Sequence, residues 1–315
     1  MIMPEMRSLS GVHRTAALSF GGLLALFYFY TSGFGILSVE SHRGVFLGAT
    51  LGLVFLWYPF SKRSPFDRFS IIDLLLVFIS LAVGLYFTYN YPTLSERFGQ
   101  ITTLEIASGG LLIVLSLEAA RRSVGILLPV LGILALLFSH QAISRELPLL
   151  IAHPGFSSPR IAAFMFNSMD GMFGTVCYTL ATYVMPFVIF GVFLAKSGVG
   201  KFFIDLTYSL VGRSQSGTAQ VAVVGSALMG SISGSPVANV VATGNFTIPL
   251  MKKTGYHPNE AGAIESCAST GGMFTPPVMG AAAFFMVEFT GIPYVEIIKI
   301  ATIPAIIYYL SVGIM

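Results

Sequence analysis

The sequence contains few charged residues. Asp, Glu, Lys and Arg make up 10% of the 315 residues, whereas hydrophobic residues make up 55% and the mean hydropathy is +0.81. Because soluble globular domains carry about 25% charged residues, this composition excludes that class and indicates an all-α polytopic membrane protein. The formal net charge of +3 is too small and too dispersed to suggest nucleic-acid binding.

The sequence also has only two cysteines and five histidines. Cys177 and Cys267 both fall inside apolar segments, so a disulfide framework is excluded. The five histidines show no metal-ligand spacing, and no nucleophile motif of a hydrolase occurs in a suitable context. We therefore expect neither a zinc-type site nor an enzyme.

Apolar runs predict a series of membrane helices. The predicted elements are spans near residues 14–38, 44–60, 70–90, 103–120, 124–139 and 175–195, an amphipathic piece near 199–212, and a last span from about 296. A long external loop is expected over residues 140–174. Asp73, Glu105 and Glu118 lie near span ends, where we expect them at the membrane interface.

The distribution of Lys and Arg predicts the orientation. Alternating loops place most of the basic residues on one side: Arg7, Arg14, Lys62, Arg63, Arg68, Arg121, Arg122, Lys196, Lys201, Arg213, Lys252 and Lys253. The other side holds only Arg43, Arg97, Arg145, Arg160 and Lys299. Because basic loops stay in the cytoplasm, the amino terminus is expected to be cytoplasmic.

One long uncharged segment, residues 214–251, carries Ser231-Ile-Ser-Gly-Ser-Pro-Val-Ala-Asn239 at its centre. It is too long for one crossing of a core about 30 Å thick, and its middle is too polar to face lipid. We interpret it as two helices meeting at a polar tip, with both ends on the cytoplasmic side. Its many small residues favour a re-entrant pair whose tip stops near the midplane; a full hairpin reaching the far surface is the alternative.

A second break is predicted in the helical segment 257–289, where Met273-Phe-Thr-Pro-Pro277 follows Gly271-Gly272. Both breaks place a hydroxyl residue before proline, Ser235-Pro236 and Thr275-Pro276, which predicts an N-cap followed by the first residue of a new helix. In both, glycine can end the preceding helix. Each break should therefore place a helix carboxyl end beside a helix amino end.

These ends predict two kinds of site. Freed carbonyls and hydroxyls offer oxygen ligands for Na⁺, and the expected ligand residues are Ser231, Ser233, Gly234, Ser235, Thr270, Gly271 and Gly272. The amino ends favour an anionic substrate, and the expected substrate-binding residues are Ser235, Pro236, Asn239, Thr275 and Pro276. Helix packing is the plainer explanation for the small polar residues taken singly.

Glu265 is a carboxylate within a predicted span, which is costly enough to suggest a function. Pairing with Lys252 or Lys253, or a place at the cytoplasmic headgroup level, is the alternative.

Residues 227–244 and 269–280 resemble the permease of tripartite ATP-independent periplasmic (TRAP) transporters, and the resemblance extends to residues 246–256 and 291–294. The chain is most similar to the fused form, in which a four-helix small subunit, here residues 1–122, precedes the large subunit, here residues 123–315. The resemblance implies an ion-transporter-like fold, an elevator mechanism and Na⁺ coupling. It also implies a bacterial inner-membrane location and organic acids delivered by a periplasmic solute-binding protein, of TAXI type in the fused form.

Two departures from the family pattern stand out. Met273 and Thr275 occupy places where the family usually has glutamine and methionine. The family's large subunit has two inverted repeats, each with a hairpin and a broken helix, whereas this sequence has one set and stops inside an apolar run. We therefore expect a fragment carrying half a site. A non-transporting membrane scaffold or truncated product is the rival class, and a channel is a further one.

The orientation is testable by labelling single cysteines with a membrane-impermeant maleimide. Cysteines placed beside Arg63 and Lys253 should react only from the cytoplasm, and one at Ser157 only from the periplasm, because basic loops are retained inside. Periplasmic labelling beside Lys253 would contradict the re-entrant arrangement.

Overall fold

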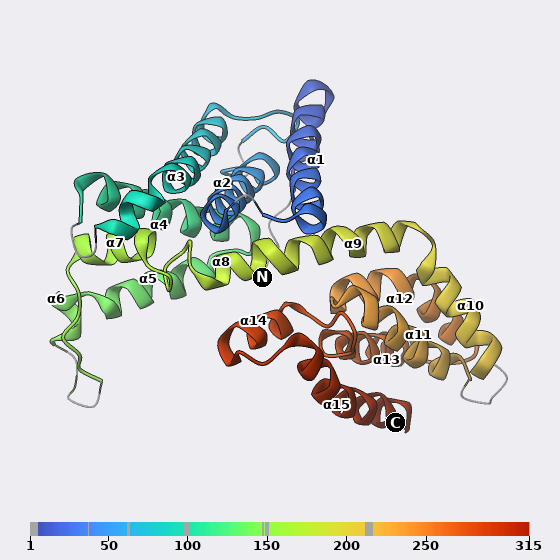
Figure 1. Cartoon of the computed structure of the whole chain (residues 1–315). Helices are drawn as coiled ribbons and strands as arrows, with labels where there is room; N and C mark the ends of the chain where they lie inside the picture. Colours follow the sequence, from blue (N-terminus) through green and yellow to red (C-terminus); the bar gives the residue numbers. More distant parts are fainter. Residues whose placement is uncertain are drawn as a thin grey trace. The chain divides into compact units, whose positions relative to one another are not determined.

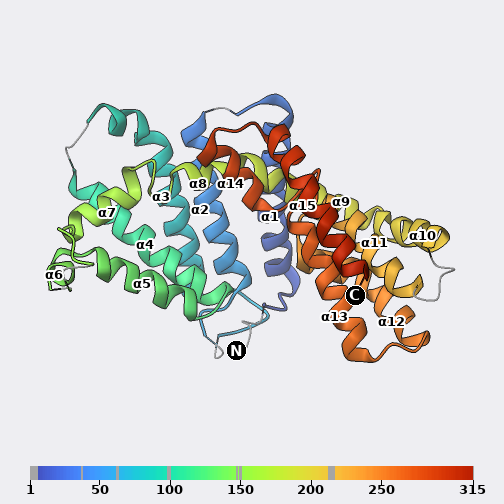
Figure 2. The same ribbon diagram turned by 90° about the horizontal axis from the view of Figure 1, so that it is seen from below.

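The computed structural model describes residues 6–36, 38–61, 64–97, 101–146, 148, 151–211 and 217–314. Within these ranges the chain is almost entirely helical, and an isolated bridge between His140 and Phe156 is the only strand-like pairing. The helices form two compact units, Met1–Thr182 and Tyr183–Met315, which we describe separately (Figures 1 and 2). Lys62, Arg63, Arg213 and residues 214–216 lie outside the described ranges.

The first unit begins with four long helices. Its helices are α1 (Gly11–Phe34), α2 (Val39–Trp57), α3 (Ile71–Glu96), α4 (Thr103–Ser123), α5 (Leu127–Ser139), α6 (Gln141–Ser144), α7 (Ser158–Asn167) and α8 (Thr175–Thr179). A π-helical turn, Leu180–Val184, follows and contains the boundary between the units. The predicted domain boundary after residue 122 stays a prediction, since the compact units divide later.

The second unit contains the predicted hairpin and broken helix. Its elements are α9 (Met185–Lys196), α10 (Val199–Val211), α11 (Gly217–Ser233), α12 (Pro236–Lys253), α13 (Pro258–Thr270), the 3₁₀ turn η2 (Gly271–Met273), α14 (Ala281–Thr290) and α15 (Tyr294–Ile314). Ala222, Met251 and Ala261 form a buried core between α11, α12 and α13. These three helices therefore pack as one body.

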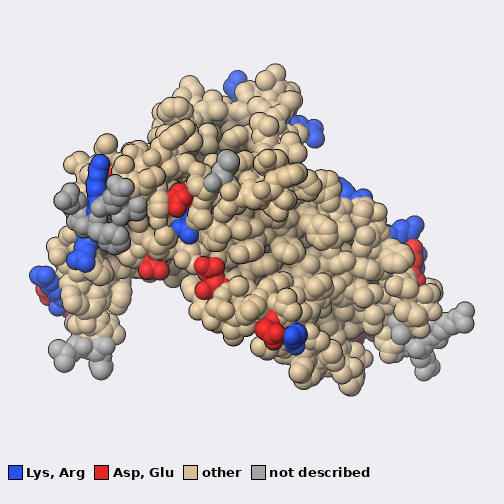
Figure 3. Space-filling view, viewed as in Figure 1, with Lys and Arg blue, Asp and Glu red and all other residues tan. Residues whose placement is uncertain are grey.

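Five helical stretches are long and apolar enough to cross a membrane: Gly11–Phe34, Ile71–Thr93, Thr103–Ser123, Thr175–Leu194 and Tyr294–Ile314. They confirm the corresponding spans predicted from the sequence and the class of all-α polytopic membrane protein. Figure 3 shows that charged side chains are few and separated by wide uncharged surface on one face of the molecule. Such a surface suits contact with lipid rather than water.

The expectation of a loop over residues 140–174 is wrong in part, because α7 forms there. α7 buries Ala162, Ala163 and Phe166. It packs so closely on α4 that a Cβ at Gly109 would lie 1.9 Å from the Ala162 carbonyl oxygen. Phe166 then joins an aromatic cluster in which the rings of Phe87 and Phe173 stack with centroids 4.0 Å apart. Burial of this apolar face against α4 and α3 explains a short helix that local periodicity did not predict.

Asp73 and Glu105 are buried within the protein at the ends of their helices, and their place at the membrane interface stays a prediction. Asp73 accepts from the guanidinium of Arg7 and, at 2.6 Å, from that of Arg122, and all three side chains are fully buried. Glu105 closes the capping box of α4 and accepts from Asn167 at 3.0 Å. The long-range partners Arg7 and Asn167 come from distant parts of the sequence, so burial of these carboxylates was not visible locally.

Replacing Asp73 with alanine should destabilise the protein by about 3–5 kcal/mol, because two buried guanidinium groups lose their counter-charge. The measurement is the unfolding free energy in mixed micelles titrated with sodium dodecyl sulfate. Glu296→Gln is the control, since the Glu296–Lys299 pair is 52% and 64% exposed and an exposed pair contributes about 0–1 kcal/mol. Equal losses in the two variants would contradict a structural role for the buried cluster.

Candidate functional site

The hairpin between α11 and α12 turns at Gly234. α11 ends at Ser233, and Gly234 adopts a positive φ of 59°, which an L-residue with a side chain rarely adopts. Ser235 is the N-cap of α12, where its hydroxyl accepts from the Ala238 amide, and Pro236 occupies the first turn. This local geometry confirms the predicted helix end and helix start.

The second break has a different local structure. α13 ends at Thr270, η2 follows, and α14 begins only at Ala281 with Gly280 as its N-cap. The prediction that Thr275 and Pro276 begin a new helix is therefore wrong. The Thr275 hydroxyl instead donates back to the Gly271 carbonyl at 2.6 Å, and two consecutive prolines at 276 and 277 keep the following backbone non-helical.

The two breaks meet through their backbones. The Val278 amide donates to the Ser231 carbonyl at 3.1 Å. A Cβ at Gly230 would lie 2.7 Å from the Gly272 Cα, and one at Gly234 would lie 1.9 Å from the Met279 carbonyl oxygen. Glycine is therefore required at these crossings, because any side chain would push the breaks apart.

Two carbonyl oxygens near the contact between the breaks lack the N–H group that a continuous helix would supply four residues later. The carbonyls of Ile232 and Gly272 each precede a proline by four residues, and proline has no N–H to donate. The Ser233 hydroxyl is buried and has no hydrogen-bond partner among the described residues. Such a group is costly unless something coordinates it. A set of ligands made only of neutral oxygen atoms fits a small hard cation such as Na⁺.

The structure brings some of the predicted cation ligands together and separates others. Ser231, Gly234 and Gly272 lie at the contact between the two breaks. The Thr270 hydroxyl instead donates to the Ser266 carbonyl of its own helix at 2.8 Å. Gly271 lies under the aromatic ring of Tyr309, since a Cβ there would be 2.6 Å from that ring. Thr270 and Gly271 thus face away from the contact that joins Ser231 to Val278.

Asn239 lies inside the hairpin rather than at an open surface. It is fully buried, and its amide nitrogen donates to the Ser226 carbonyl of α11 at 2.8 Å. It therefore links the two arms one turn below the tip. Thr218 and Thr254 make a similar link at the open end, with their hydroxyl oxygens 2.8 Å apart.

Glu265 is the centre of a polar cluster that sequence reasoning did not identify. Its carboxylate is fully buried and accepts from the hydroxyls of Ser226 at 2.9 Å, Thr243 at 2.5 Å, Thr247 at 2.5 Å and Ser269 at 3.1 Å. The donors come from both hairpin arms and from α13. The four-residue spacing of Thr243 and Thr247 on one face of α12 was the signal available in the sequence.

The alternative in which Glu265 pairs with a lysine is not supported. Lys252 and Lys253 are exposed at the far end of α12, and the ion pairs among the described residues do not include Glu265. The carboxylate is thus held by hydroxyls alone.

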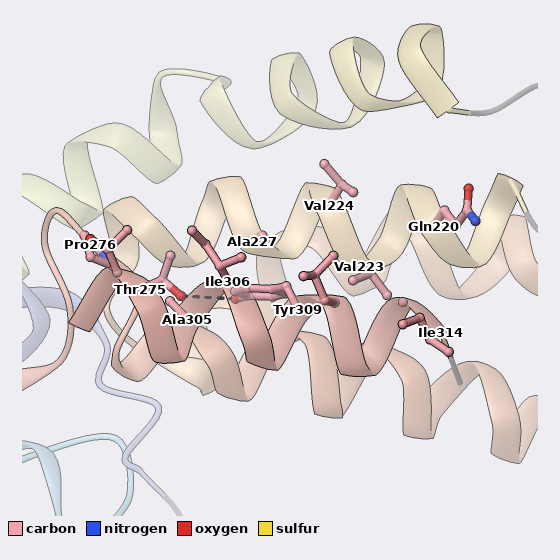
Figure 4. Close-up of a pocket in the computed structure, with 13 residues that line it drawn as sticks. Gln220, Val223, Val224, Ala227, Thr275, Pro276, Ala305, Ile306, Tyr309 and Ile314 are labelled. Atoms are coloured by element: carbon pink, nitrogen blue, oxygen red, sulfur yellow. Dashed lines mark hydrogen bonds between the residues drawn. The ribbon is translucent and has the colours of Figure 1, made fainter. Parts of the chain in front are cut away.

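An apolar groove of about 580 Å³ lies between α11 and α15 (Figure 4). Thr275 and Pro276 line one end, and the Thr275 hydroxyl is 3.4 Å from that of Tyr309. Gln220 and Thr302 are the other polar lining residues. Two of the five residues predicted to bind substrate therefore share this groove, while Ser235 and Pro236 lie at the hairpin tip and Asn239 is buried between its arms.

Comparisons with known proteins give a consistent result. The profile of the family described as tripartite ATP-independent periplasmic transporter, DctM component, matches residues 111–315. The chain is similar to the C4-dicarboxylate TRAP transporter large permease protein DctM of Vibrio cholerae, with 32% identity over 128 residues, or 41% of this chain and 27% of that protein. No solved structure matches the chain.

Two further relatives are named for different substrates. The 2,3-diketo-L-gulonate TRAP transporter large permease protein YiaN of Escherichia coli is 30% identical over 100 residues, covering 32% of this chain and 23% of that protein. The isethionate TRAP transporter permease protein DctMQ of Oleidesulfovibrio alaskensis is 32% identical over 118 residues, covering 37% and 17%. The chain thus spans less than a third of the length of these relatives.

Replacing Gly234 with alanine should separate the two breaks and destabilise the protein by more than the about 1–2 kcal/mol of a left-handed backbone alone, because the new methyl would overlap the Met279 carbonyl. The measurement is unfolding in mixed micelles. Gly255→Ala is the matched control, since Gly255 also has a positive φ but has open space around it. Equal effects would show that the backbone contact does not constrain the tip.

Proposed function

The chain belongs to the family of DctM components of tripartite ATP-independent periplasmic transporters, and from this membership we propose that it forms part of a Na⁺-coupled permease importing organic acids. It is a multi-pass membrane protein with the helical spans described above. The observation that carries the proposal is the meeting of two helix breaks at Gly234, next to which Ser233 has a buried hydroxyl without a hydrogen-bond partner among the described residues. Broken helices that meet in this way form the ion and substrate sites of many secondary transporters.

In the proposal, Na⁺ is a coupling ion bound at the tip. Ser233 supplies its hydroxyl oxygen, and Ile232 and Gly272 supply backbone carbonyls, each of which is followed four residues later by a proline without an N–H group. Neutral oxygen ligands suit a monovalent cation, which binds and leaves during each cycle. Ser231, Gly234 and Ser235 shape the turn that presents these atoms.

The substrate in the proposal is an organic anion near the start of α12. The first N–H groups of a helix have no intrahelical acceptor and carry partial positive charge. Ser235 and Pro236 set this amino end at the tip, beside the proposed cation. The organic anions in the names of the relatives support this substrate class. The groove at Thr275 and Pro276 is the second candidate for the substrate path.

The remaining parts of the proposal concern movement and partners. A re-entrant hairpin is supported by the small residues near its tip, Gly230 and Gly234, which suit close packing against protein better than exposure to lipid. The shared core of α11, α12 and α13 suits elevator-type movement as one body. We further propose a cytoplasmic amino terminus, residues 1–122 acting as a fused small subunit, and a TAXI-type periplasmic solute-binding protein as partner.

A transporter and a channel differ in their dependence on gradients and on the binding protein. In proteoliposomes that hold the chain together with a matching second permease half and the solute-binding protein, the proposal expects carboxylic-acid uptake that needs an inward Na⁺ gradient, whereas the chain without the second half should not transport. A channel would pass the solute down its own gradient without the binding protein, and a scaffold would pass none.

Ser233→Ala should weaken Na⁺ binding about tenfold, corresponding to about 1.4 kcal/mol, because a lost ligand is not replaced. Ser235→Ala should cost about 1 kcal/mol of stability through the lost cap, with a smaller change in Na⁺ affinity. The measurement is Na⁺-dependent thermal stabilisation of the purified chain, with choline as the reference cation. Ser266→Ala is the control, since that exposed hydroxyl bonds only within α13. Unchanged Na⁺ affinity in Ser233→Ala would remove Ser233 from the site.

A further inference from the structure

We propose that Glu265 is an ionised positioning residue that holds the hairpin to α13 and supplies the negative charge for the cation bound at the tip. This inference rests on the proposed Na⁺ site and names a residue that does not touch the ion. Glu265 lies on α13, seven residues before Gly272, and its hydrogen-bond partner Ser226 lies on α11, four residues before Gly230. Gly230 and Gly272 belong to the contact between the breaks.

The hydrogen bonds around Glu265 offer enough donors for the ionised carboxylate of the proposal. An ionised carboxylate only accepts and has about four acceptor positions. Four hydroxyls reach it: three share Oε1, those of Ser226, Thr243 and Ser269, and that of Thr247 approaches Oε2. Charge-assisted bonds of this kind are stronger than neutral ones, so the cluster stabilises the charge while it joins three helices.

No cation neutralises this charge among the described residues that pack around it. α11 carries no charged residue, and the described basic residues of α10 and α12, which are Lys201, Lys252 and Lys253, are exposed. On α15, Lys299 pairs with Glu296, and both are exposed. On α13 itself, Glu260 is exposed and caps the helix. A buried charge without a counter-ion is costly, and a cation bound nearby would offset that cost.

The hairpin tip is close enough to Glu265 for the charge of its carboxylate to change the affinity of the proposed cation site. Seven residues at about 1.5 Å each place Glu265 about 10 Å from Gly272 along the helix axis. At that separation and an effective dielectric constant of about 20, a unit charge changes the affinity for a monovalent cation on the order of 15-fold. Salt screens an exposed charge at this distance, but much less a buried one.

Glutamine can replace Glu265 without breaking the cluster. With its carbonyl on the three-donor side, its Nε2 would donate to the Thr247 hydroxyl. Thr247 could then turn its own hydrogen to the Thr243 carbonyl, which lies 3.1 Å away. Glu265→Gln therefore removes the charge and keeps the contacts, whereas Glu265→Asp keeps the charge and shortens the reach by one methylene.

The two variants separate an electrostatic role from a purely structural one. We expect Na⁺ affinity to fall on the order of 15-fold in Glu265→Gln and to stay within about threefold of the unsubstituted chain in Glu265→Asp. Stability without Na⁺ should follow the opposite order, with Glu265→Asp the less stable of the two, because its carboxylate loses hydroxyl partners. Equilibrium binding of radioactive sodium and thermal unfolding in choline buffer, both on the full chain in nanodiscs, measure the two quantities.

Glu260→Gln is the matched control, because it makes the same chemical change on the same helix at an exposed position where glutamine also serves as a capping residue. Its Na⁺ affinity should be unchanged. Equal Na⁺ affinity in Glu265→Gln and the unsubstituted chain would overturn the electrostatic role, as would a larger loss in Glu265→Asp than in Glu265→Gln. Absence of Na⁺ binding by the unsubstituted chain would instead overturn the proposed cation site together with this inference.

Discussion

The close approach of two interrupted helices is the constraint on which the candidate site depends. The end of α11 and the turn after α13 touch backbone to backbone, which only the glycines at 230, 234 and 272 allow. A membrane interior offers no water to satisfy broken helices, so each interruption must find its partners within the protein. The amide of Val278 satisfies one carbonyl, that of Ser231, across this contact. The oxygens left over are the candidate ligands of the proposed cation site.

Polar side chains in the second unit form a series of contacts along the hairpin. Thr218 and Thr254 join the arms at the open end, Glu265 gathers hydroxyls in the middle, and Asn239 bonds to Ser226 just below the tip. In lipid such contacts hold helices together where the hydrophobic effect does not. The series keeps both arms of the hairpin aligned with each other.

The first unit uses buried charge in a different way. Asp73 lies between Arg7 and Arg122, so opposite charges compensate each other within the protein. Glu265 has hydroxyl partners and no described basic neighbour. A compensated cluster of the first kind fixes a scaffold, whereas a carboxylate of the second kind stays responsive to a cation that comes and goes. This contrast is why we assign a structural role to Asp73 and a functional one to Glu265.

The sequence by itself determined the features that depend on neighbours within a few residues. Apolar runs predicted the long helices, and Gly234-Ser-Pro236 predicted where α11 ends and α12 begins, because caps and proline act within one helical turn. The same rule failed at Thr275-Pro276, where contacts to Gly271, Met273 and Tyr309 hold a turn instead of a helix start. Only the tertiary structure showed the partners of Asp73 and Glu265 and the docking of α7. Those contacts join residues far apart in the chain, and they form only when helices pack at particular faces and depths.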